Sequence, residues 1–239
     1  TCHVMGIVNV TPDSFSDGGD YNTTEQSVAR AMAMIDQGAS IIDVGGESTR
    51  PGADDVSEDE EINRVVPVIR ELAAKGHVVS IDTRHAGVME AAIDAGAAII
   101  NDVTGLEGDE RSMEVAAASG KPVMLMHMQG EPGTMQANPH YECAVLDVYD
   151  YLLDRVESCE RAGIPRDRIC IDPGIGFGKT LEHNLQLLHG LGSLEVWERP
   201  ILLGVSRKSM IGKILKHDDV EDRDAGTVAL TAIGRRAGA

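Results

Sequence analysis

The chain has 239 residues, of which 42% are apolar, and a formal net charge of −18. Nucleic acid and anionic lipid repel so acidic a chain, so we expect neither nucleic acid nor a membrane as a partner. The apolar fraction predicts one domain with a sizeable core over residues 1–239, and no apolar run approaches the length of a membrane span. The four cysteines show no metal-binding or redox spacing, which predicts reduced thiols and a cytoplasmic protein.

Apolar segments of strand length alternate with helical patterns along the whole chain, as in parallel βα units. Between the first two segments, Glu25–Gln37 has the spacing of an amphipathic helix. Thr23 or Thr24 is its expected N-cap, and Gly38 its expected left-handed residue after the last turn. The apolar segments run over consecutive residues, as expected of strands covered by helices. The seven expected strands are Val4–Val8, Ser40–Val44, Val78–Ile81, Ala98–Ile100, Pro122–Met126, Arg168–Ile171 and Ile201–Val205.

Repetition along the chain favours a closed α/β barrel. Residues 35–42 and 93–100 share a helix end, a Gly-Ala break and a strand in the same register. The predicted fold is therefore a (β/α)8 TIM barrel with its site at the carboxyl ends of the strands. The helix expected at Ala225–Arg236 is followed by Ala237-Gly238-Ala239, another Gly-Ala joint, where an eighth strand would begin. Because a barrel that lacks a strand exposes two edges, we expect the eighth strand and the last helix to lie in residues beyond this sequence.

A polar loop follows the first expected strand. It runs from Asn9 to Gly19, consists largely of turn-forming residues, and contains Phe15, one of two phenylalanines in the chain. Loops at strand ends often hold the chemistry of α/β proteins, although an ordinary surface turn has the same composition.

Acid and amide side chains recur where the expected strands end. One carboxylate in such a place is as often a helix cap or a structural ion pair as a ligand-binding group. Five strand ends with polar side chains that face one mouth favour a site. The residues concerned are Asp43, Asp82, Asn101, Asp102, His127 and Asp172.

Three of these groups suggest a ligand class. Asp82, Asn101 and Asp172 would form a cluster of acceptors on neighbouring strands, with Lys208 as a counter-charge. Buried carboxylates need donors, and two adjacent N–H groups on a flat heterocycle would satisfy one in bidentate fashion. The pattern therefore suits a pterin or a purine.

The glycine-rich run Pro173–Lys179 is not a nucleotide-binding motif. Gly178-Lys179-Thr180 matches the end of a P-loop, but Pro173 stands where its first glycine belongs. Its glycines more plausibly let the backbone approach a planar ligand, with Phe177 as apolar cover. In the other loops, Arg50 could hold an oxyanion or be a solvated surface residue, and Asn9 could bind Mg²⁺ through its amide oxygen.

Taken together, the motifs resemble those of the dihydropteroate synthases of folate biosynthesis over nearly the entire chain. The resemblance implies a TIM barrel that joins p-aminobenzoate to 6-hydroxymethyl-7,8-dihydropterin diphosphate and releases pyrophosphate. It also implies Mg²⁺ as cofactor, sulfonamides as competitors of p-aminobenzoate, and a homodimer. The matching segments are Met5–Gly19, Asp43–Gly52, Ser80–Thr83, Asn101–Val103, Met126–Gly130, Asp172–Lys179 and Ser206–Ser209.

The same resemblance implies roles for single residues. The expected catalytic residues are Asp82, Asp172, Lys208 and Arg50. The expected pterin-binding residues are Asp82, Asn101, Met126, Asp172 and Lys208. The p-aminobenzoate side would consist of Phe15, Ser48, Thr49, Pro51, Phe177, Lys208 and Ser209, with Asn9 on the metal. An Arg-x-His pair that the family carries on its eighth strand is absent from this sequence.

These parts suit an SN1-like displacement in which the bond to the diphosphate breaks early and the arylamine then attacks. No Ser/His/Asp or Cys/His constellation is apparent, and this mechanism needs none. A methyltetrahydrofolate-dependent methyltransferase domain would share the barrel and the pterin cluster. A non-catalytic pterin-binding module is the alternative from a different class.

Overall fold

A computed structural model describes residues 2–11, 20–48, 56–131, 133–217 and 219–239. Six parallel strands form one sheet in the order β1-β2-β3-β4-β5-β6. Their bounds are β1 (Met5–Asn9), β2 (Ile41–Gly45), β3 (Val79–Asp82), β4 (Ile99–Asp102), β5 (Val123–Met126) and β6 (Ile169–Asp172).

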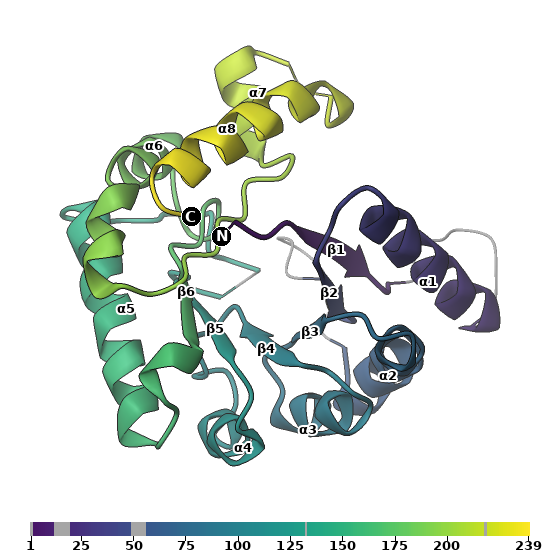
Figure 1. Ribbon diagram of the computed structural model, residues 1–239. Helices are drawn as coiled ribbons and strands as arrows, with labels where there is room; N and C mark the ends of the chain where they lie inside the picture. The colour runs from purple at the N-terminus through teal and green to yellow at the C-terminus, as the bar shows by residue number, and fades with distance from the viewer. Residues whose placement is uncertain (1, 12–19, 49–55, 132, 218) are drawn as a thin grey trace.

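Helices alternate with the strands and form an outer ring around the curved sheet (Figure 1). No helix in the described ranges has both the length and the apolar character needed to cross a lipid bilayer. The helices are α1 (Asp20–Asp36), α2 (Glu58–Ala74), α3 (Ala86–Asp94), α4 (Ser112–Ser119), α5 (Ala144–Arg161), α6 (Leu181–His189), α7 (Ser209–Leu215) and α8 (Asp224–Arg236). Short 3₁₀ helices occupy Arg166–Arg168, Leu191–Trp197 and Glu221–Arg223. The predicted α/β class with parallel, barrel-like strands is confirmed.

The strands carry apolar and polar side chains on opposite faces, because successive residues of a strand point in opposite directions. Ile42, Val44 and Ile81 are fully buried in the apolar core. Asp43 and Ser80, which alternate with them, are hydrogen-bonded to each other and so share the other face. The interior of the curved sheet is therefore polar near the ends of β2 to β4. The expectation of uninterrupted apolar strands was wrong at these positions.

Five of the first six strands extend one or two residues beyond their expected last residue, and β5 ends where expected. The ladder pairs Asn9 with Gly45, Gly45 with Asp82, and Asp82 with Asn101. Asp82, Asp102 and Asp172 are thus the last residues of their strands, and Asp43 and Asn101 lie within theirs, while His127 follows β5. Because a regular strand fixes its side chains more firmly than a loop does, these residues are held in set positions.

The expected seventh strand, Ile201–Val205, is reduced to a single parallel bridge between Ile171 and Ile201. Ile171 donates to Pro200 O at 3.1 Å, and Leu202 donates to Ile171 O at 2.9 Å. The next rung would need an N–H at position 173, and Pro173 has none. Pairing with β6 therefore stops after one bridge. In the described residues the sheet has six strands rather than the seven expected within this sequence.

The first helix begins at Asp20, so Thr23 and Thr24 lie inside it and the expected N-cap was wrong. Its apolar spacing starts later than the helix itself, because a first turn need not carry core side chains. Gly38 has φ +109°, which confirms the expected left-handed residue after the helix. The helix expected at Ala225–Arg236 is confirmed as α8.

Candidate functional site

A buried hydrogen-bonded row lies under the mouth of the sheet. Asp43 of β2 accepts from Ser80 Oγ at 2.5 Å and from Asn101 Nδ2 at 3.0 Å. Burial raises the pKa of Asp43 to about 6, although both hydrogen bonds oppose the shift. Because the amide nitrogen of Asn101 is used by Asp43, its amide oxygen remains available as an acceptor for a ligand.

Asp82, at the end of β3, is the least satisfied acid of the site. Its Oδ1 is buried without a hydrogen-bond partner among the described residues. Burial raises the pKa of Asp82 well above its ordinary value, and the charges of Asp43 and Asp102 raise it further. A buried carboxylate in this state favours a ligand that brings its own N–H donors.

Asp172 occupies the equivalent place at the end of β6 and is buried. It accepts from Gly174 N at 2.7 Å. Burial raises the pKa of Asp172 to about 6. The hydrogen bond from Gly174 N and the positive charges of Lys208 and Lys179 limit that rise. Met126, which pairs with Asp172 in the ladder, is buried beside it and offers an apolar wall.

Lys208 and Phe177 face each other across the next part of the site. Lys208 Nζ lies 4.1 Å from the centroid of the Phe177 ring, within range of a cation–π contact. Burial lowers the pKa of Lys208, while Asp172 and Asp82 oppose that change. Ser209, exposed, follows Lys208 as the first residue of α7.

The remaining predicted site residues lie at the rim or outside the described residues. Asn9 ends β1 with an exposed side chain, and Ser48 is half-buried shortly after β2. Within the described residues no group of three His, Cys, Asp or Glu side chains could hold a metal ion. Phe15, Thr49, Arg50 and Pro51 lie outside the described residues.

The sequence alone assigned no role to Lys179, a buried lysine two residues after Phe177. Lys179 Nζ lies 2.9 Å from His127 Nδ1 and 2.9 Å from Phe177 O. Burial lowers the pKa of Lys179 to about 7, and Asp172 opposes the shift. The available signal was a lysine that follows a glycine-rich run directly but fits no phosphate motif.

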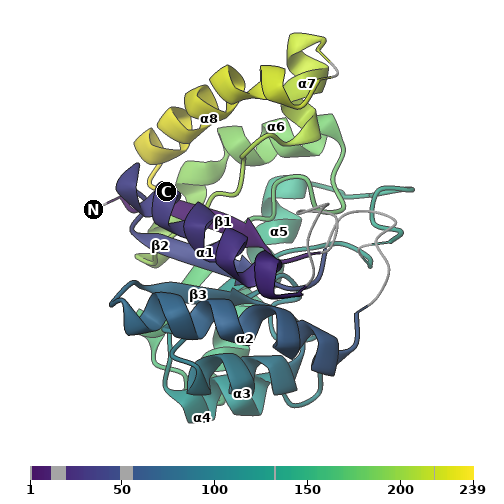
Figure 2. The same ribbon diagram turned by 90° about the vertical axis from the view of Figure 1, so that its right-hand side faces the viewer.

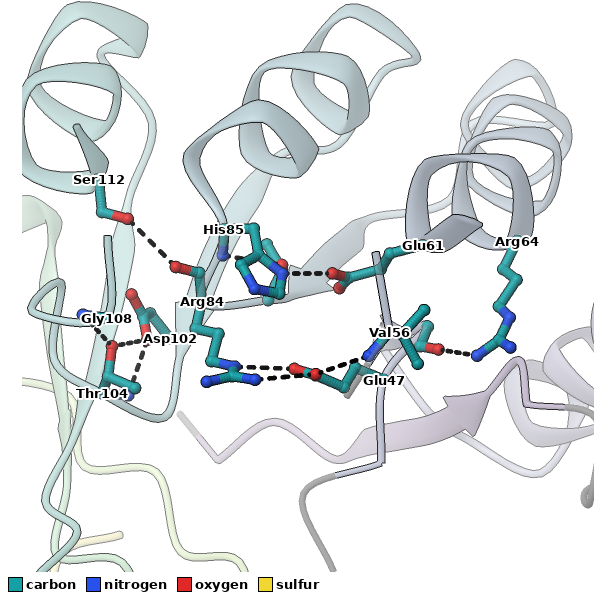
Figure 3. A network of polar contacts seen from close by, with 12 residues as sticks. Glu47, Val56, Glu61, Arg64, Arg84, His85, Asp102, Thr104, Gly108 and Ser112 are labelled. Atoms are coloured by element: carbon teal, nitrogen blue, oxygen red, sulfur yellow. Dashed lines mark hydrogen bonds and ion pairs between the residues drawn. The ribbon is translucent and has the colours of Figure 1, made fainter. Parts of the chain in front are cut away.

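A second network missed from the sequence lies beside the end of β2 (Figure 3). Arg84 donates to both carboxylate oxygens of Glu47 at 2.9 Å, and Glu47 also accepts from Val56 N at 3.4 Å. His85 Nδ1 lies 2.8 Å from Glu61 Oε2 in the same picture. Although partial burial opposes it, Arg84 lowers the pKa of Glu47 below its ordinary value. The network anchors Glu47 and Val56, the residues next to Ser48 and to the segment 49–55.

The arrangement can bind a flat, donor-rich heterocycle and stabilise positive charge on it. Asp82 and Asp172 supply acceptors, and Asn101 adds a neutral one. Lys208 supplies a donor between this group and the aromatic face of Phe177. An acid pair with raised pKa values and a lysine with a lowered one mark a binding or catalytic site.

Comparison with known proteins gives one consistent result. The sequence profile of the family described as "Pterin binding enzyme" matches residues 5–239. The dihydropteroate synthase of Escherichia coli strain K12 is 48% identical over 238 residues, which cover 99% of this chain and 84% of the relative. A probable bifunctional folylpolyglutamate synthase/dihydropteroate synthase of Haloferax volcanii is 49% identical over 236 residues, 99% of this chain and 28% of that protein.

Solved structures agree with these relatives. The Yersinia pestis dihydropteroate synthase in a sulfonamide drug complex superposes with a TM-score of 0.93 at 47% identity. That match covers 99% of this chain and 86% of the other. The Xanthomonas albilineans dihydropteroate synthase in complex with 7,8-dihydropteroate gives a TM-score of 0.89 at 42% identity, with 99% and 85% covered.

Proposed function

This chain belongs to the dihydropteroate synthases of the pterin binding enzyme family, and from that premise we propose how its residues carry out the reaction. The reaction joins p-aminobenzoate to 6-hydroxymethyl-7,8-dihydropterin diphosphate, with 7,8-dihydropteroate and pyrophosphate as products. The observation that carries the assignment of roles is the buried, unpaired Oδ1 of Asp82 beside Asn101. That oxygen lacks a donor among the described residues, and the N–H groups of a pterin would supply one.

The pterin lies, in this proposal, across the ends of β3, β4 and β6. Asp82 and Asp172 accept from its N–H groups, and the amide oxygen of Asn101 accepts from another. Met126 covers the ring, and Lys208 donates to a ring nitrogen or carbonyl. The row from Ser80 through Asp43 holds Asn101 in the orientation that this contact requires.

Bond breaking to the diphosphate comes first in an SN1-like displacement. As the bond at the pterin methylene lengthens, positive charge spreads into the pterin, and the carboxylates of Asp82 and Asp172 stabilise it. The arylamine of p-aminobenzoate, held between Phe177, Lys208 and Ser209, then attacks the methylene carbon. The amine loses its proton to solvent or to pyrophosphate, so no protein base is required.

Mg²⁺ is the proposed cofactor, with Asn9 as its protein ligand. A hard cation bound to a diphosphate takes most of its ligands from phosphate and water. An exposed amide at the end of β1, without an acidic cage among the described residues, fits that pattern. When bound, the ion would neutralise charge on the leaving pyrophosphate.

The roles of Phe15, Ser48, Thr49, Arg50 and Pro51 rest on the sequence. We propose Arg50 as a ligand of an oxyanion, and the other four as contacts of p-aminobenzoate. The Glu47–Arg84 pair supports this placement for Ser48, because it fixes the chain directly before it.

We further propose that the enzyme is a cytoplasmic homodimer. The four cysteines are free thiols, which suits a reducing compartment. Large exposed apolar side chains gather on and beside α7 and α8, which suits an interface between copies. They are Ile214, Leu215, Val220, Val228 and Ile233.

Pyrophosphate release tests the proposed function. We expect release only when both dihydropterin diphosphate and p-aminobenzoate are present with Mg²⁺, and calorimetry should detect pterin binding without p-aminobenzoate. Pterin binding without any turnover would leave a binding module and refute the catalytic assignment.

A further inference from the structure

Lys179 is a buried lysine whose three donors all have partners. Its side chain is 3% exposed. Its Nζ lies 2.9 Å from His127 Nδ1, 3.2 Å from His127 O and 2.9 Å from Phe177 O. An ammonium group has three N–H donors, so this set uses all of them. Among the described residues, the hydrogen-bond partners of Lys179 Nζ are two carbonyls and one imidazole.

These acceptors connect two separate loops. His127 follows the last residue of β5, and Phe177 lies in the segment between β6 and α6. The carbonyl after Phe177, that of Gly178, accepts from Tyr141 OH at 2.8 Å. The carbonyl before it, that of Gly176, accepts from the exposed side chain of Gln136. Three consecutive carbonyls therefore accept hydrogen bonds. The carbonyl of Phe177 accepts from a buried ammonium group, which is a stronger donor than the amide and the hydroxyl that serve the other two.

His127 is a rigid anchor for Lys179. Burial lowers the pKa of His127 to about 3, and the charge of Lys179 contributes, so the ring is neutral. In the tautomer that carries its proton on Nε2, Nδ1 accepts from the Lys179 ammonium group. Tyr151 packs against the ring edge-on at a centroid distance of 4.9 Å. The main-chain N–H of His127 donates to Asp172 O at 3.0 Å, which continues the ladder between β5 and β6. The anchor thus belongs to the sheet rather than to a free loop.

We propose that Lys179 is a positioning residue for the p-aminobenzoate side of the site, an assignment that rests on the proposed function. It fixes the main chain of Phe177 to the end of β5 and thereby sets the Phe177 ring beside Lys208, at 4.1 Å from its Nζ. Two of the proposed pterin acceptors, Asp82 and Asn101, stand on β3 and β4 and have no hydrogen bond with Lys179, while Asp172 interacts with Lys179 only through its charge. Loss of Lys179 leaves three buried acceptors without their donor, so the Phe177 segment should shift to reach water.

Steady-state kinetics of Lys179→Met, measured at pH 6.5 where most of Lys179 keeps its proton, tests the assignment. We expect KM for p-aminobenzoate to rise about tenfold or more, with KM for dihydropterin diphosphate within about threefold of the wild type. The decisive readout is a double-mutant cycle with Phe177→Leu. If Lys179 acts through Phe177, adding Lys179→Met to Phe177→Leu should raise KM for p-aminobenzoate by no more than about twofold. The proposal would be overturned if the effects of the two substitutions on KM for p-aminobenzoate multiplied, or if Lys179→Met raised KM equally for both substrates.

Lys75→Met is the matched control. Lys75 caps the end of α2 at the surface and pairs with Glu71, so its loss should leave both KM values unchanged. If Lys179→Met does not fold, as judged by thermal unfolding, Lys179→Gln is judged by the same criteria, since it keeps two N–H donors on a shorter chain. Wild-type turnover in the same assay reports on the proposed function by itself. If the wild type turns over but the double-mutant cycle does not give the expected result, only the role of Lys179 is refuted.

Discussion

Asp82 is a residue that favours ligand binding and lowers the stability of the ligand-free protein. Its carboxylate stands within a group of acids, and one of its oxygens is buried without a partner among the described residues. Removing a charge from water without donors is costly, so the empty site favours the protonated acid. A pterin with two adjacent N–H groups would supply the missing donors and reverse that preference.

Asp82→Ala should therefore separate binding from stability. We expect dihydropterin affinity to fall about 100-fold or more, since two charge-assisted hydrogen bonds are lost. The midpoint of thermal unfolding should stay the same or rise, because an unpaired buried acid is removed. Calorimetry and thermal unfolding measure the two effects, with the exposed Asp154→Ala on α5 as control. Wild-type-like affinity in Asp82→Ala would refute the assignment.

The buried carboxyl group of Asp43 makes the free energy of unfolding depend on pH. Burial raises the pKa of Asp43 in the folded protein to about 6, against an ordinary value of 3.8. A raised folded pKa contributes stability that is fully present below about pH 4 and is lost as the pH rises through 6. Relative to wild type, Asp43→Asn should therefore gain stability between pH 4 and pH 7, by up to roughly 3 kcal/mol. Denaturant unfolding at several pH values measures this, and a flat or opposite difference would contradict it.

At the scale of elements, the sequence predicted types and order better than ends. Among the described residues β1 to β6 and α1 to α6 follow the predicted βα alternation, because buried parallel strands and amphipathic helices leave clear periodicities. The last two helices, α7 and α8, have no strand between them. The seventh strand was overestimated because an apolar run does not show whether its neighbour can pair with it, and Pro173 limits the neighbour here. The start of α1 was missed because the apolar spacing that marks the helix begins at Val28, well inside it.

The sequence indicated site residues where motif and strand end coincide, as at Asp82, Asn101 and Asp172, and it indicated Lys208 by its motif alone. What the sequence could not show is which polar groups satisfy one another. The bond from Asn101 to Asp43 joins residues 58 positions apart, and that from Lys179 to His127 spans 52. Such pairs depend on the exact packing of loops, which local sequence patterns do not encode. Their roles in catalysis stay predictions.

The glycine-rich segment after β6 can be tested as an element. Gly174 has φ +66°, and a Cβ there would lie 1.9 Å from His127 O, a backbone atom that cannot move aside cheaply. Gly163 has φ +94° with no atom near its Cβ position, so Gly163→Ala measures backbone strain alone, about 1 kcal/mol. We expect Gly174→Ala to cost at least about 2 kcal/mol more in unfolding free energy and to weaken p-aminobenzoate binding. Equal costs for the two variants in denaturant unfolding would contradict the close approach.

At the scale of the whole molecule, the charge of −18 opposes the anionic substrates. We expect Lys208 to oppose this at the site itself. Low dielectric strengthens the effect of a buried charge there, while solvent and salt weaken the effect of distant surface acids. The fold supplies that contrast, since the strands lie inside a ring of helices (Figures 1 and 2) and the polar residues Asp43, Ser80 and Asn101 are buried there.

The molecule's exposed apolar side chains bear on its assembly. In both views α7 and α8 lie together on one side, far from α2 to α4 (Figures 1 and 2). Val228 of α8 is 70% exposed and Ile233 is 50% exposed, which is unfavourable in a monomer.

A charge within an interface weakens association by several kcal/mol, so Val228→Glu should raise the dimer dissociation constant about 100-fold or more. Sedimentation velocity should show the wild type as a dimer and Val228→Glu as a monomer. Leu146→Glu, at a 60% exposed position on α5, is the matched control and should remain dimeric. A monomeric wild type, or a dimer that Val228→Glu leaves intact, would show that this face does not join two copies.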